Sequence, residues 1–150
     1  MPAFITFGRI LFAVLFIVSG AFKLYDLSAT AKDIAAKIVI PAVLTTYTSQ
    51  IEALAGMQMP QILAITAGSI ELICGIMIAL NFGVRFFSIL LIFFVIAVTF
   101  YYHDFWNQTG PESRNNLVHV LKNLSIVGAL FMIAGYGRTP RSTEPVYGDV

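Results

Sequence analysis

One carboxyl group stands alone inside a long apolar stretch. Glu71 lies ten residues from either end of residues 61–81, which otherwise carry no charge. A helix rises about 1.5 Å per residue, so a spanning helix here places this carboxyl near the membrane midplane. An ionised side chain at that depth costs on the order of 3 kcal/mol on insertion scales. Two interpretations stay open: a protonated or lysine-paired glutamate that only locks helices together, or one that serves a substrate, proton or cofactor.

Further polar residues lie toward one end of the apolar stretches. His119, Lys122 and Asn123 have the i, i+3, i+4 spacing of a single helical face. Such side chains normally turn inward, which predicts a polar cavity near the outer leaflet above Glu71. We expect Lys122 or Lys23 to reach Glu71, directly or through water, because a lysine stem spans several ångströms. The candidate catalytic residues are Glu71 (proton acceptor or ion pair), His103 and Lys122, and the candidate cofactor-binding residues are Lys23, His119, Asn123 and Trp106.

The composition indicates a membrane protein. Hydrophobic residues make up 58% of the 150 residues and charged residues 11%, whereas soluble domains carry about 25% charged residues. Four stretches are long enough to cross a bilayer as helices: residues 4–24, 61–81, 86–103 and 116–136. The sequence therefore predicts an all-α membrane four-helix bundle over residues 1–138, followed by a polar tail, residues 139–150. The alternative for the first stretch is a cleavable signal peptide, which would leave three spans.

The connection over residues 25–60 is too interrupted to span and too long for a turn. Residues 30–33 resemble a capping box that would start a short amphipathic helix, and Pro41 would end it. A second apolar stripe follows between Val43 and Leu54. We expect two short helices in the membrane interface over one end of the bundle, with a poorly ordered loop as the alternative. Residues 103–115, which contain Gly110-Pro111, are expected to form a polar loop.

Charge and cysteine content exclude several classes. The net charge of +1 offers no basic patch for nucleic acid. The single cysteine, Cys74, excludes an intramolecular disulfide and a CxxC pair. Basic residues outside the hydrocarbon favour cytoplasmic termini by four to three: Arg9, Arg85, Arg138 and Arg141 lie on one side, and Lys32, Lys37 and Arg114 on the other. A multi-pass protein of the bacterial inner membrane is therefore expected, with the lipid bilayer and other membrane-associated subunits as partners.

Short motifs in a fixed order resemble the DoxX family of small four-helix membrane proteins. The first span opens on Gly8-Arg9-Ile10-Leu11 and closes on residues 19–23, Ser-Gly-Ala-Phe-Lys. Glu71-Leu72-x-x-Gly75 follows in the second span, and His103-x-x-Trp106 and Lys122-Asn123-Leu124 follow later. The resemblance covers nearly all of residues 6–135. It implies a link to quinone-coupled oxidation, and it also implies accessory proteins of varied function.

Two functional classes follow. The first is a subunit of a quinone-linked oxidoreductase or electron-transfer complex, in which donors such as His103, His119, Lys122 or Asn123 face the quinone carbonyls and Glu71 moves a proton. The second is a non-catalytic structural or assembly subunit. No haem, iron–sulfur or nucleotide motif is present, which favours a subunit over a self-sufficient enzyme.

Two questions about the predicted cavity have alternative answers: the role of its aromatic residues and the presence of a metal site. Tyr101, Tyr102, Phe105 and Trp106 would either wall its entrance or form an interfacial aromatic belt. The alternative of a metal site would use His103, His119, Asp104 and Glu71. We expect no metal, because the two histidines lie on different helices without a paired spacing.

Overall fold

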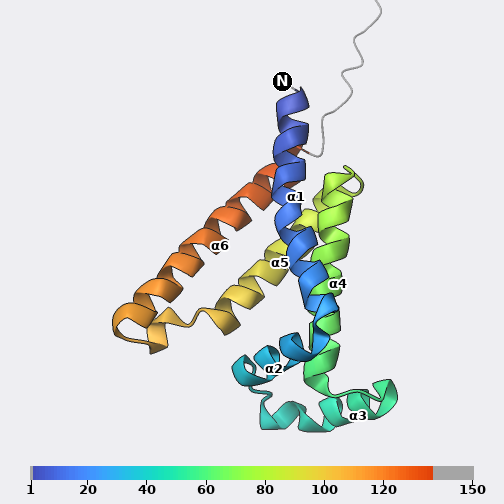
Figure 1. Cartoon of the computed structure of the whole chain (residues 1–150), viewed down its shortest axis with the longest axis vertical. Helices are drawn as coiled ribbons and strands as arrows, with labels where there is room; N and C mark the ends of the chain where they lie inside the picture. The colour runs from blue at the N-terminus through green and yellow to red at the C-terminus, as the bar shows by residue number, and fades with distance from the viewer. Residues whose placement is uncertain (1, 137–150) are drawn as a thin grey trace, which may run out of the picture.

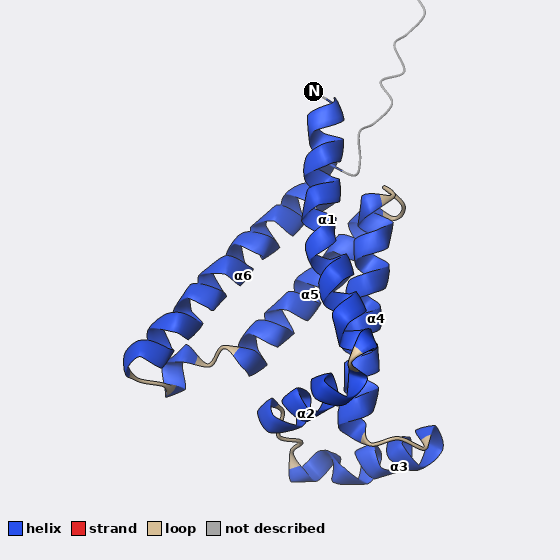
Figure 2. Ribbon diagram, in the orientation of Figure 1, coloured by secondary structure: helices blue, strands red, loops and turns tan. Residues whose placement is uncertain are grey.

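The computed structural model describes residues 2–136, which are almost entirely helical (Figure 2). The order of elements is α1 (Pro2–Tyr25), α2 (Leu27–Lys37), η1 (Ala42–Leu44), α3 (Thr45–Ala55), α4 (Met59–Ala79), α5 (Val84–Tyr102), η2 (Phe105–Asn107) and α6 (Gly110–Tyr136). Helices α1, α4, α5 and α6 are long and apolar enough to cross a membrane. The predicted all-α membrane fold with four spans is therefore confirmed.

The four spans form two pairs. Helix α1 packs most extensively on α4, and α5 packs on α6. The pairs meet near the upper end of Figure 1, and the α5–α6 hairpin diverges from α1 and α4 toward the lower end. The first residues of α1 and the last residues of α6 lie at the same end, as an even number of spans requires. The predicted tail, residues 139–150, lies outside the described residues.

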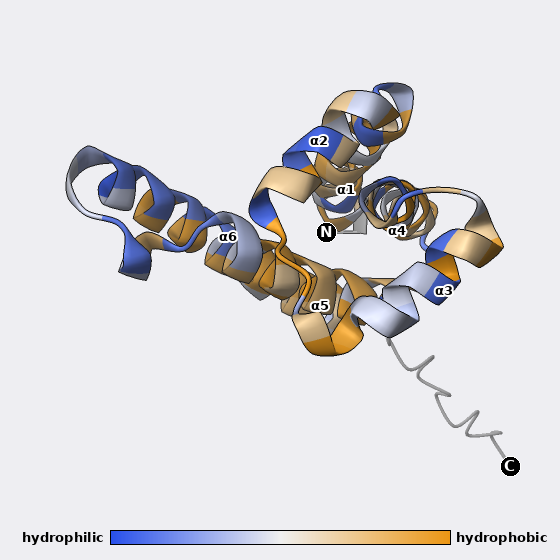
Figure 3. Ribbon diagram, turned by 90° about the horizontal axis from the view of Figure 1, so that it is seen from below, coloured by the Kyte–Doolittle hydropathy of each residue, from blue (hydrophilic) through white to orange (hydrophobic). Residues whose placement is uncertain are grey.

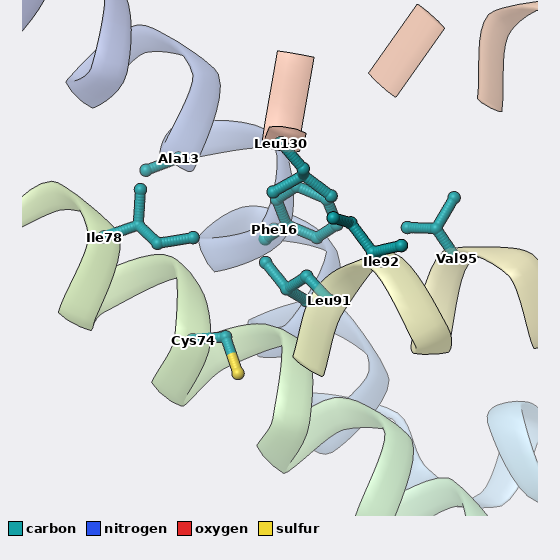
Figure 4. Close-up of a cluster of buried hydrophobic side chains, with 8 residues drawn as sticks. All are labelled: Ala13, Phe16, Cys74, Ile78, Leu91, Ile92, Val95 and Leu130. Atoms are coloured by element: carbon teal, nitrogen blue, oxygen red, sulfur yellow. The ribbon is translucent and has the colours of Figure 1, made fainter. Parts of the chain in front are cut away.

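A small hydrophobic core joins the pairs where they meet (Figure 4). Its fully buried members are Ala13, Cys74, Ile78, Leu91 and Leu130, and Phe16, Ile92 and Val95 complete it. Most other large apolar side chains are exposed, as expected of helices that face lipid. The buried Cys74 acts here as a small core residue.

Helices α2 and α3 lie across the lower end of the bundle (Figure 1). Helix α2 begins earlier than the capping box predicted at residues 30–33. It begins at Leu27, and the Asp26 side chain caps it by accepting a hydrogen bond from the Ala29 N–H at 3.0 Å. Asp26, and not Thr30, is the N-cap, because α1 ends at Tyr25 and only Asp26 separates it from α2. Helix α3 buries none of its residues, in keeping with an interfacial helix whose apolar stripe faces lipid.

The predicted loop over residues 103–115 is shorter than expected. Helix α6 already begins at Gly110, whose φ of 70° is left-handed. Pro111 then occupies the first turn, where its missing N–H and fixed φ favour helix initiation. The proline therefore starts the helix and does not extend the loop. Seen from below, the first half of α6 is hydrophilic, whereas α5 is mostly hydrophobic (Figure 3).

Candidate functional site

Glycines bring the backbones of α1 and α4 into contact. A Cβ placed on Gly20 would lie 2.6 Å from the carbonyl oxygen of Gly68 and 2.6 Å from the amide nitrogen of Leu72. One on Gly75 would lie 3.2 Å from the carbonyl oxygen of Ala13. Any side chain at these positions would force the helices apart, so small residues are required for this crossing. The crossing in turn places the end of α1 beside the middle of α4.

This contact allows a partly buried ion pair to form between α1 and α4. The Lys23 ammonium lies 2.7 Å from Glu71 Oε2, and it also donates to Ser19 Oγ at 2.6 Å. Helical side chains tilt toward the N-terminus, so Lys23 on the lower end of α1 points toward the membrane midplane, where Glu71 lies. The Glu71 side chain is only 9% exposed and that of Lys23 31%. The prediction that a lysine reaches Glu71 is confirmed, and the lysine is Lys23.

A large cavity lies next to this pair. It has a volume of about 670 Å³ and is bounded by the end of α1, by α2, and by the facing sides of α4 and α5. Lys23 lines it, whereas Glu71, the partner of Lys23 in the ion pair, does not. Most of the wall is apolar and includes Ile34, Ile38, Leu63, Ala67, Ile70, Phe94, Ala97 and Val98.

A few polar groups interrupt the apolar wall. They are Lys23, Thr30, Asp33, Thr66, Tyr101 and Tyr102. The Asp33 carboxylate lies beside the Tyr102 hydroxyl, which brings α2 and the end of α5 together. Thr30 donates to the carbonyl oxygens of Lys23 and Asp26 at 3.2 and 2.9 Å, so its hydroxyl anchors α2 to the end of α1. An apolar chamber with a few fixed polar groups is the usual form of a small-molecule site.

A second group of polar side chains joins α5 to α6. The imidazoles of His103 and His119 stack with centroids 4.7 Å apart and planes within 5°. His103 Nδ1 lies 3.1 Å from Asn116 Oδ1. One turn deeper, Asn123 donates to the Thr99 hydroxyl at 2.8 Å. These contacts fix the register of the α5–α6 hairpin.

Loop residues extend this second group. The Asn116 amide donates to Gln108 Oε1, and Gln108 donates to Asp104 Oδ1 at 2.9 Å. Ser113 donates to the carbonyl oxygen of Phe105 at 3.0 Å. The loop between α5 and α6 is therefore held by its own side chains.

The sequence-predicted residues do not line a single cavity. Lys23 and Glu71 form one group, whereas His103, His119 and Asn123 belong to the α5–α6 group. We expected a polar cavity near the outer leaflet above Glu71, whereas the wall of the observed cavity beside Lys23 is mainly apolar. The physical reason is that the α5–α6 hairpin diverges from α1 and α4 toward the lower end of Figure 1, which separates its polar residues from Lys23 and Glu71.

Two further candidates lie at the surface. Lys122 is exposed on α6 and forms no ion pair within residues 2–136. Trp106 is 50% exposed, with ring centroids 5.6 Å from Phe100 and 5.2 Å from Phe105. This arrangement resembles an interfacial aromatic belt more than the wall of a cavity.

Sequence reasoning missed one partner of the ion pair and several residues of the cavity. Ser19 lies one turn before Lys23, and this i, i+4 spacing was the available signal for its hydrogen bond. Thr30, Asp33 and Thr66 gave no such signal, because their position depends on how α2 folds back over α4. Within residues 2–136, no three side chains of His, Cys, Asp or Glu come together as a possible metal site.

Comparisons with known proteins agree on the family. The DoxX family model matches residues 4–104, which run from the first turn of α1 past the end of α5. The Inner membrane protein YphA of Escherichia coli (strain K12) is 27% identical over 133 residues, which cover 89% of this chain and 82% of that protein. No solved structure is significantly similar to the chain. The chain therefore belongs to the DoxX family of membrane proteins.

Proposed function

We propose that the protein is a membrane subunit of a quinone-linked oxidoreductase, and that the cavity between α1, α2, α4 and α5 receives the quinone ring. The observation that carries this proposal is the Lys23–Glu71 ion pair at the wall of an apolar cavity of about 670 Å³. A quinone needs an apolar chamber for its ring and a hydrogen-bond donor for its carbonyl oxygen. The end of α1 and the facing walls of α4 and α5 supply both.

Each polar residue has a stated role in this proposal. Lys23 can donate to a carbonyl oxygen while Ser19 and Glu71 hold its ammonium in place. Glu71 can accept or return a proton through Lys23 as the charge in the cavity changes. Asp33 and Tyr102 lie at the side of α2 and offer a second proton-transfer pair. Quinone reduction consumes two electrons and two protons, and we assign the electrons to a partner dehydrogenase subunit.

His103, His119, Lys122 and Asn123 have a different part in the proposal. They do not line this cavity, so we assign the first two, with Asn123, to holding the α5–α6 hairpin and its loop. That loop and the exposed Lys122 and Trp106 are then available to a partner subunit. With the termini on the cytoplasmic side, as the basic residues favour, the loop faces outward.

A cavity-filling variant tests this proposal without breaking the ion pair. Ala97 lines the cavity from α5, and Ala97→Phe would occupy part of its volume. Ala21 is exposed on α1 and lies outside the cavity, so Ala21→Phe is the matched control. Both proteins are purified in mild detergent, and quinone is extracted and quantified per mole of protein. We expect at least a fivefold loss in the first variant and no loss in the second.

The same experiment distinguishes the quinone-binding subunit from a second candidate function, a non-catalytic structural or assembly subunit. This candidate is favoured by α6, of which only Leu130 and Ala134 are buried over 27 residues, leaving a long face for another protein. It predicts equal quinone content in both variants and co-purification of an intact complex. Absence of quinone from the native protein, with partner activity per complex unchanged by Ala97→Phe, would overturn the quinone proposal.

A further inference from the structure

A second cavity lies at the opposite end of the bundle, where α1, α6 and the turn between α4 and α5 meet. Its volume is about 350 Å³. The wall is mainly apolar, with Ile5, Phe12, Val84 and Met132 among its residues. Three side chains with polar groups, Arg9, Asn81 and Tyr136, also line it. This cavity is separate from the one proposed for quinone, and no residue lines both.

Arg9 has unused hydrogen-bonding capacity in this cavity. One terminal nitrogen of its guanidinium donates to Asn81 Oδ1. Its Nε is buried and has no hydrogen-bond partner in the described part of the chain. A guanidinium carries five N–H donors in a planar fork. The neutral Asn81 amide can orient this fork but leaves its charge without a counter-charge.

The position of Asn81 is fixed by the turn. Its φ is 59°, a left-handed conformation that asparagine tolerates better than most residues, and Gly83 follows at 54°. The turn thus holds the side-chain oxygen toward α1. Arg9 is therefore oriented by a side chain of the turn between α4 and α5.

Among residues 2–136, the charged side chains at this end of the bundle are all basic. Arg9 and the exposed Arg85 lie here. Among residues 2–136, Glu71 is near the midplane, and the other acidic residues belong to the opposite end: Asp26, Asp33, Glu52, Asp104 and Glu112. No described carboxylate is therefore placed to neutralise Arg9, so a bound anion would be favoured.

We propose that this cavity is a binding site for an anionic phospholipid. The lipid phosphate would pair with the Arg9 guanidinium, which matches phosphate oxygens in a bidentate manner. An acyl chain would lie along the apolar wall formed by α1 and α6. Basic pockets between spanning helices are suited to anionic head groups. A free phosphate could meet the guanidinium as well, but it would gain nothing from the apolar wall, and this difference can be measured.

Lipid-dependent thermal stability tests the site. The full chain is purified in an uncharged detergent and titrated with phosphatidylglycerol, with phosphatidylcholine of the same acyl chains, and with inorganic phosphate. We expect phosphatidylglycerol alone to raise the Tm in a saturable manner. Arg9→Gln should raise the half-saturating lipid concentration at least tenfold, whereas Arg114→Gln, which removes an exposed arginine at the other end, should leave it unchanged.

A second variant keeps the test decisive if Arg9→Gln fails to fold. Asn81→Gly retains the left-handed turn and removes the amide that orients Arg9, so the half-saturating concentration should rise several-fold. Equal stabilisation by phosphatidylcholine would overturn the site. An unchanged response in Asn81→Gly, together with an unchanged response or no folding in Arg9→Gln, would also overturn it. Equal stabilisation by inorganic phosphate would show a soluble anion as the ligand and refute the lipid.

Discussion

The Lys23–Glu71 pair gives the most direct quantitative test of the bundle. At 2.7 Å, two unit charges attract by about 6 kcal/mol at an effective dielectric constant of about 20. Desolvation of both groups offsets part of this attraction. Removal of one partner from a buried pair typically costs about 3–5 kcal/mol, because the other charge is stranded. Lys23→Met should therefore lower the free energy of unfolding by an amount in this range.

A double-mutant cycle in mixed micelles measures the pair itself. Unfolding is followed by titration with a denaturing detergent for Lys23→Met, Glu71→Gln and the double variant. We expect a coupling energy of at least about 2 kcal/mol, because the double variant strands no charge. Lys122→Met is the matched control and should change stability by less than about 0.5 kcal/mol, since Lys122 is exposed. Additive losses in the cycle would refute the ion-pair account.

Three further outcomes follow from the fold. Gly20→Ala should lose about 1–3 kcal/mol of stability in the same assay, because its Cβ would meet α4 backbone at 2.6 Å. Gly128→Ala, with nothing within 4 Å, should lose none. Asn123→Leu, which removes the donor to the α5 hydroxyl, should lose about 1 kcal/mol. Single cysteines at Ser49 and Phe82, in a cysteine-free background, should be labelled from opposite sides of the membrane; labelling from one side would refute this topology.

The pattern of hydrophobicity was sufficient to predict the spans. Glu71 could be placed near the midplane because the apolar stretch around it has the length of a bilayer. The backbone of α1 comes close to the same face of α4, at Gly68 and Gly75. The choice between Lys23 and Lys122 was not available from sequence, because both lie at a suitable depth. It depends on which helix crosses α4, and the Gly20 contact decides that in favour of α1.

The cavity could not be predicted from the periodicity of apolar residues in the sequence. Helical patterns give the face of each span, but they do not give the angle between pairs of spans. The α5–α6 hairpin diverges because its core contacts gather at one end, around Leu91 and Leu130. The polar residues near His103 then pair within the hairpin, and α2 fills the space beside α4.

The division of the spans into two pairs links the ion pair to the cavity. The α1–α4 pair is held by backbone contact and by a partly buried ion pair, so it is the closely packed half of the molecule. The α5–α6 hairpin meets it through apolar side chains at one end and through α2 at the other. The cavity lies between these two contacts, with Lys23 on the α1–α4 side and Tyr102 on the hairpin. A ligand there would contact both halves at once, so its binding should hold the hairpin against α4 and couple occupancy of the cavity to the position of the α5–α6 loop.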